Sequence, residues 1–152
     1  MPVDVEQGRV RALFSRVDQI DRVAGTLPND DPRRHTLTAV VRQELSEAEP
    51  VRPIIAAGLL ELTEKTVRTW VSEGVLTATA ERPRLLLDAA RLHEVVRLVR
   101  DLKAAGKTRG LLDEVYRRLS DAALLDRDDL QTSLEQMRRG EGRVVRGPSR
   151  VA

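Results

Sequence analysis

The side chains that could carry out a reaction are few and scattered in this sequence. There is no cysteine among the 152 residues, which excludes disulfides, thiolate metal sites, iron–sulfur clusters and cysteine nucleophiles. The two histidines, His35 and His93, fall on different predicted elements. Beside Glu94 and Arg97, His93 is expected to be an exposed polar residue. No glycine-rich phosphate-binding loop occurs, so we expect no enzymatic activity, no metal and no cofactor.

Segment 64–72, EKTVRTWVS, offers a different chemistry, the recognition of double-stranded DNA. With Val67 and Val71 facing inward, a helix here directs five polar side chains outward: Lys65, Thr66, Arg68, Thr69 and Ser72. An arginine can form a bidentate pair with guanine, while threonines can contact a phosphate or a thymine methyl group, and a lysine near the helix start can reach the backbone. Trp70 belongs to the inward face and is expected to anchor the core.

Two further arginines, Arg82 and Arg84, follow this segment in the stretch ATAERPR. They lie where the loop of a small β wing would contact phosphates or an adjacent minor groove. The candidate DNA-binding site consists of the five outward residues and these two arginines: Lys65, Thr66, Arg68, Thr69, Ser72, Arg82 and Arg84.

Two predicted helices precede this segment. Apolar residues recur every three or four positions over about 4–24 and again over about 33–47, which indicates one apolar face on each helix. The intervening PNDDP is typical of a turn. Residues 1–48 therefore predict a helical hairpin that must pack on the rest of the chain or on a partner.

Two short helices and a pair of strands follow. The segment 53–60 is apolar on nearly all sides and predicts a buried helix; Thr63 is a good N-cap for 64–72, and Gly74 suits its end. Residues 75–77 and 85–87 could be short strands around a loop. We expect a helix-turn-helix with a small β wing.

The remaining chain is predicted to be helical up to a basic tail. Asp88 should cap a long helix of about 89–105 that ends at Gly106, and helices of about 109–120 and 127–139 should follow. Residues 140–152 are rich in glycine and arginine and have almost nothing to bury, so we expect a flexible tail. The chain carries a net charge of only +2, and the basic excess lies in the last fifteen residues, 138–152.

The predicted fold class is therefore mainly α, with a helix-turn-helix and small β wing flanked by an N-terminal helical hairpin and C-terminal helices. The expected domains are a hairpin (1–48), a helix-turn-helix domain (51–120), a short helical extension (121–139) and the basic tail (140–152).

The stretch AAGLLELTEKTVRTWVSEGVL resembles the helix-turn-helix of MerR-like and excisionase-like DNA-binding domains. In those families a Thr-x-Arg-x-aromatic recognition helix follows the turn, and Thr66, Arg68 and Trp70 occupy these positions here. The stretch LLLDAARLHEVVRLVRDLKAAGKTRGLLDEVYRRL is similar to the MerR segment after the wing. The likeness covers about 53–120 and implies a major-groove reading helix.

The sequence also departs from the MerR pattern. Thr69-Trp70 replaces the usual aromatic pair, and Arg82-Pro83-Arg84 replaces the wing's Gly-Tyr or Arg-Tyr, which removes a tyrosine contact to phosphate. Only about thirty residues follow position 120, so we expect no long C-terminal dimerisation helix.

These features predict a small bacterial transcriptional regulator that binds double-stranded DNA in a sequence-specific way. One short helix supplies little discrimination, so a homodimer on an inverted or direct repeat is expected. Two alternatives stay open: an antitoxin that represses its own operon and binds a toxin protein through the N-terminal hairpin or the tail, and an architectural factor of phage or recombination systems.

The sequence gives no sign of a membrane segment. No apolar run approaches the ~20 residues of a membrane span, and the N-terminus lacks the pattern of a signal peptide. We expect a cytoplasmic protein with no membrane partner.

Overall fold

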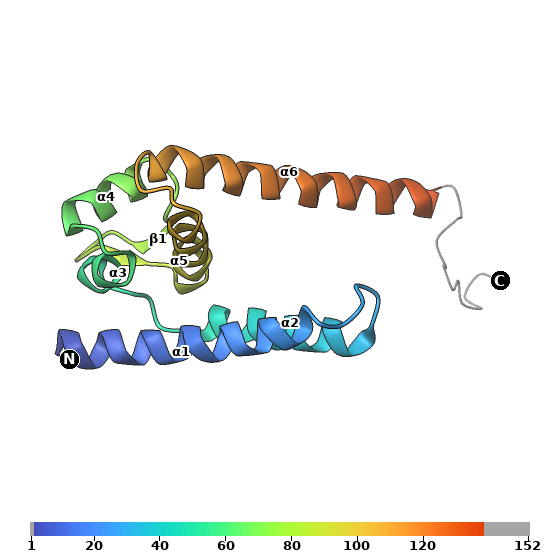
Figure 1. The fold of residues 1–152 in the computed structure, drawn as a ribbon, viewed down its shortest axis with the longest axis horizontal. Coiled ribbons are helices and arrows are strands. Elements are labelled where there is room, and N and C mark those ends of the chain that lie inside the picture. The colour runs from blue at the N-terminus through green and yellow to red at the C-terminus, as the bar shows by residue number, and fades with distance from the viewer. Residues whose placement is uncertain (1, 139–152) are drawn as a thin grey trace. The chain divides into compact units, whose positions relative to one another are not determined.

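Six helices and one pair of short antiparallel strands make up residues 2–138, the part of the chain that this computed structural model describes (Figure 1). The prediction of a mainly helical fold with a small sheet is thereby confirmed. The chain divides into two units, the first ending at Val115 and the second beginning at Tyr116. None of the helices within the described range is both long and apolar enough to cross a membrane.

Helices α1 (Val3–Ala24) and α2 (Pro32–Glu47) lie side by side as the predicted hairpin (Figure 1). Phe14 and Val17 of α1 and Val41 and Leu45 of α2 are buried. The α1 stripe is less completely covered than the periodicity suggests, because Val5 and Val23 at its ends are exposed.

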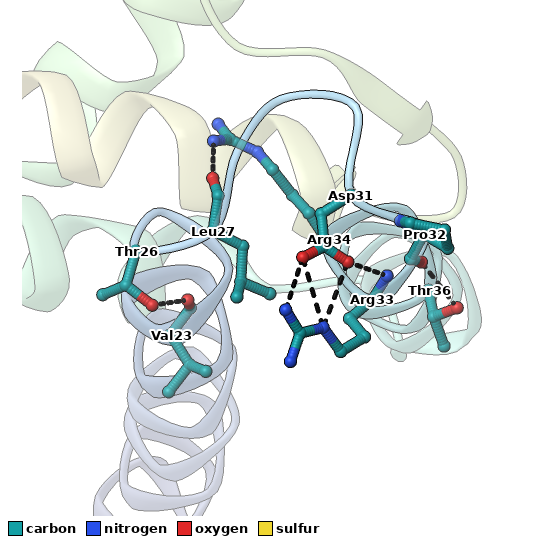
Figure 2. A network of polar contacts seen from close by, with 8 residues as sticks. All are labelled: Val23, Thr26, Leu27, Asp31, Pro32, Arg33, Arg34 and Thr36. Carbon is teal, nitrogen blue, oxygen red and sulfur yellow. Dashed lines mark hydrogen bonds and ion pairs between the residues drawn. The ribbon is translucent and has the colours of Figure 1, made fainter.

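The connection between α1 and α2 is fixed by local polar contacts (Figure 2). Asp31 caps α2 by accepting a 2.8 Å hydrogen bond from the backbone N–H of Arg33, and its carboxylate also pairs with the Arg33 guanidinium at 2.6 Å. This side-chain bond holds the pKa of Asp31 below its usual value. Arg34 Nη1 donates to the carbonyl of Leu27 at 2.8 Å, which ties the start of α2 back to the turn.

Helix α3 (Pro53–Leu60) contacts α1, α4 and α5. Ile55, Ala56 and Leu60 are buried, in agreement with the predicted buried helix. At Gly58 a Cβ atom would lie 2.6 Å from Oε1 of Gln7 on α1, so a larger residue there would require the flexible end of the Gln7 side chain to move.

The small sheet pairs β1 (Ala78–Ala80) with β2 (Leu86–Leu87), and Val51 extends it through two backbone bonds to Leu87. The prediction of a strand at 75–77 is wrong. The N–H groups of Val75 and Leu76 both donate to the carbonyl of Trp70, and their side chains are buried. Their apolar character reflects core packing at the exit of the preceding helix, and strand pairing begins three residues later.

Helix α5 (Ala89–Ala104) begins and ends as predicted. The Asp88 carboxylate accepts a 2.9 Å hydrogen bond from the N–H of Arg91, and Gly106 adopts a positive φ of 87° just after the helix. The apolar face of α5 is buried through Leu92, Val95, Val99 and Leu102.

Helix α6 (Leu111–Arg138) is one continuous helix, whereas the sequence predicted two. With 28 residues, α6 is also longer than the short helices expected after Gly106. The predicted interruption, 121–126, consists of Ala, Leu and Asp without a glycine or proline, so nothing in it stops a helix. Residue 139 and the predicted flexible tail, 140–152, lie outside the described residues.

Candidate nucleic-acid interface

The candidate reading helix is α4 (Glu64–Ser72), which is capped as predicted. Thr63 Oγ1 accepts a 3.1 Å hydrogen bond from the N–H of Thr66. At the other end, Gly74 adopts a positive φ of 83°, a conformation that suits glycine. Both signals that delimit α4 in the sequence therefore operate in the structure.

The inner face of α4 is held by Val67 and Trp70, which are 0% and 3% exposed. The prediction that Trp70 anchors the core is confirmed. Val71, predicted to face inward, is only half-buried. With its indole buried, Trp70 fixes the rotation of α4 about its axis and so determines which side chains face solvent.

The outer face presents four of the five predicted polar side chains: Lys65, Arg68, Thr69 and Ser72 are exposed. Thr66 is half-buried, and its hydroxyl lies 2.8 Å from that of Thr63. Thr66 therefore has a structural contact at the helix start in addition to any contact with a ligand.

The hydroxyls on this face are bonded back to their own helix. Thr69 Oγ1 donates to the carbonyl of Lys65 at 3.2 Å, and Ser72 Oγ donates to that of Thr69 at 2.8 Å. Each hydroxyl oxygen keeps lone pairs for a further donor. Contacts from these residues would thus start from ordered side chains.

Arg68 forms an ion pair with Glu64 one turn earlier, at 3.4 Å between Nη2 and Oε1. Both side chains are about half exposed, and such a pair on a helix contributes only about 0.2 to 0.5 kcal/mol. A guanine or phosphate could therefore displace Glu64 at low cost. The pair meanwhile keeps the guanidinium along the outer face of α4.

Arg82 and Arg84 lie on the loop between β1 and β2 and are exposed. The strands that carry this loop are paired, and Thr79 Oγ1 also donates to the carbonyl of Leu86 at 3.4 Å. The structure thus brings the candidate residues together as two groups, one on α4 and one on this loop. Among the described residues, no hydrogen bond or ion pair joins the two groups.

A second polar site lies on α5 and was missed by the sequence. His93, expected to be exposed, is 4% exposed and packs edge-on against Phe14, with ring centroids 4.9 Å apart. Its Nε2 lies 2.8 Å from Oδ1 of Asp18 on α1. The expectation was wrong because the polar neighbours Glu94 and Arg97 do not reveal that α1 packs over the imidazole.

The same two helices are joined by two arginines of α5, Arg97 with Asp21 at 3.2 Å and Arg100 with Asp18 at 3.4 Å. A signal for this pairing was present in the sequence, since two carboxylates spaced by three residues face two arginines with the same spacing. A groove of about 620 Å³ runs between α1, the end of α3 and α5 beside these pairs. Neither here nor elsewhere in residues 2–138 do three His, Asp or Glu side chains gather as a metal site requires.

Comparison with known proteins identifies no relative: no family model matches the chain, and no curated protein or solved structure is significantly similar to it.

Proposed function

We propose that the protein is a small bacterial transcriptional regulator that binds double-stranded DNA in a sequence-specific way. In this proposal α3, its connection and α4 form a helix-turn-helix, with α4 in the major groove. The observation that carries it is the outer face of α4, where Lys65, Arg68, Thr69 and Ser72 are exposed on a helix whose rotation is fixed by the buried Trp70.

The dimensions of α4 suit this role. A helix with its side chains is about 10 to 12 Å wide, and the major groove of B-DNA is about 12 Å wide. Helix α4 has nine residues. A recognition helix contacts base edges mainly through its N-terminal residues, so this short helix is long enough to read them. Arg68 would pair with a guanine after releasing Glu64, and Lys65 near the helix start would contact the phosphate backbone.

The β1–β2 hairpin acts as the wing in this proposal. Arg82 and Arg84 are exposed at its loop and would contact phosphates, which adds affinity without reading sequence. The wing's lack of a tyrosine makes these two arginines its only side chains suited to an anion within 81–85.

One copy of α4 gives limited discrimination, about 1 to 3 kcal/mol for each good base contact. Two copies on a repeated site double the number of base contacts, so the functional species in this proposal is a homodimer.

The proposal is tested by titrating the protein onto fluorescent duplexes and measuring anisotropy at several salt concentrations. We expect tighter binding to DNA from upstream of its own gene than to a scrambled duplex of equal composition. Arg68→Ala should reduce that preference by the roughly 1 to 3 kcal/mol of one base contact per half-site, whereas Arg42→Ala on α2, an exposed arginine outside the candidate site, should keep it in full. Equal and weak binding of wild type and Arg68→Ala to both duplexes would contradict sequence-specific reading.

The wing has its own signature in the same titration. Arg82→Ala combined with Arg84→Ala should weaken binding to both duplexes alike, and should reduce the salt dependence by about one ion for each lost phosphate contact. A loss confined to the preferred duplex would assign base reading to the wing instead.

A further inference from the structure

The groove between α1, the end of α3 and α5 combines an apolar floor with a cationic rim. Phe14, Leu59 and Val96 contribute apolar surface, and the groove has a volume of about 620 Å³. Five of its lining side chains are cationic and two are carboxylates, a net charge of +3 with the histidine neutral. A ligand that fits this groove is apolar along its centre and acidic at its edges.

The cations of the rim are available to such a ligand. Arg11 and Arg22 lie along one face of α1 and are exposed, and no described residue forms a hydrogen bond or ion pair with either of them. Arg97 and Arg100 are about half exposed and hold their aspartates at 3.2 and 3.4 Å. Each guanidinium has five N–H donors, so these two can donate to a second carboxylate without losing the first.

The chain itself contains a segment of the required chemistry, in α6. Leu124 and Leu125 are 51% and 64% exposed, so two adjacent leucines lie on the surface of the helix. Asp121 lies one turn before them and Asp128 one turn after, so all four side chains share one face. Residues 121–129 carry four aspartates and one arginine, a net charge of −3.

We propose that residues 121–128 of α6 from a second copy of this chain occupy the groove, with Leu124 and Leu125 on its apolar floor. Asp121 and Asp128 then face the guanidiniums of Arg11 and Arg22. Asp121 and Asp128 are separated by about 10 Å along the helix axis, and Arg11 and Arg22 by about 16 Å, a difference that the long arginine side chains span. The opposite net charges of the two surfaces cancel.

We assign the segment to a second copy because an exchange between two identical chains fills each groove once without bending α6 itself. Residues 111–138 contain no glycine or proline, the usual sites of sharp helix kinks. Two copies related by a two-fold axis form the contact twice, once in each groove. This contact would supply the dimer that the proposed DNA reading requires. Only the biological role of the dimer rests on the proposed function; the contact itself does not.

The test is sedimentation analysis of the full chain without DNA, so its result is independent of DNA binding. We expect a dimer at micromolar concentration. Arg11→Glu with Arg22→Glu, and separately Asp121→Arg with Asp128→Arg, should each weaken dimerisation about tenfold or more, because like charges then face each other. Combining the four substitutions in one chain should restore the dimer.

Matched charge reversals outside the contact serve as controls. Arg42→Glu on α2 and Glu135→Arg on α6 are exposed and should leave the dimer intact. A monomeric wild type, a dimer insensitive to the groove reversals, or failure of the fourfold variant to recover would each overturn the proposal.

The absence of cysteine allows a direct measure of proximity. A chain with Ser15→Cys, in the groove, is mixed with a chain carrying Leu125→Cys and oxidised gently. We expect a disulfide-linked heterodimer, and a much lower yield when Arg42→Cys replaces Ser15→Cys. Equal yields from the two mixtures would contradict the proposed contact, whatever the DNA titrations give.

Discussion

His93 on α5 and Asp18 on α1 lie 2.8 Å apart across 75 positions of sequence, and the imidazole also packs edge-on against Phe14. This contact joins the N-terminal hairpin to the helix that follows the small sheet. Because the imidazole is buried, its hydrogen bond to Asp18, its only polar partner in the described structure, contributes more to the free energy of unfolding than an exposed ion pair would.

Replacing His93 with alanine should therefore destabilise the protein by about 1 to 3 kcal/mol, since a buried hydrogen bond and an aromatic contact are lost together. Urea unfolding followed by circular dichroism measures the change. The exposed His35 is the matched control, and His35→Ala should change the unfolding free energy by less than about 0.5 kcal/mol. Similar effects from the two substitutions would show that the His93 contact contributes little.

Trp70 is the sole tryptophan, so intrinsic fluorescence reports on α4 directly. A buried indole predicts blue-shifted emission that moves to the red on unfolding and is poorly quenched by iodide. Addition of a bound duplex should leave the emission maximum unchanged, because Trp70 faces the core. A large shift or strong quenching on DNA binding would indicate that the indole stacks on bases.

Glu61 ends α3 in the left-handed region, with φ of 59°. A non-glycine residue there carries strain of about 1 to 2 kcal/mol. Glycine relieves this strain, but its greater flexibility in the unfolded chain costs roughly 0.5 to 1 kcal/mol of stability. Glu61→Gly should thus stabilise the protein modestly, by up to about 1 kcal/mol, because the exposed ion pair with Lys103 that is lost contributes little. Glu61→Ala removes the same ion pair without relieving the strain, and should not stabilise. A stabilised alanine variant would place the effect in the ion pair.

The pKa of Asp31 is lowered by its bond to Arg33, so its stabilising contribution has a defined pH dependence. The contribution is complete above the carboxyl's usual pKa and is lost as the pH falls through the lower, folded-state value. Asp31→Asn keeps an N-cap residue but cannot titrate. The difference in unfolding free energy between wild type and this variant should therefore shrink in acid, below about pH 4. A difference that stays constant from neutral pH into that range would contradict the assigned cause.

The sequence predicted the helices well where caps and periodicity agreed. Thr63, Gly74, Asp88 and Gly106 delimit α4 and α5 as expected, because their effects act within one turn. The first strand was misplaced because Val75 and Leu76 are apolar for packing rather than pairing.

The remaining differences arise from contacts between distant segments. The burial of His93 depends on α1, which is far away in sequence and whose packing no local pattern specifies. On α6, an apparent change of pattern was interpreted as a break although no helix-breaking residue is present. The outer face of α4 was predictable because the positions of Val67 and Trp70 determine it.

Selection from a pool of random duplexes tests the central claim, reading of DNA by α4, most directly. The wild-type protein should enrich a repeated motif, and Arg68→Ala should lose the preference for guanine at one position of each half-site while other positions persist. Arg42→Ala should return the wild-type motif. Enrichment of no motif, or of an unchanged motif by Arg68→Ala, would contradict the account.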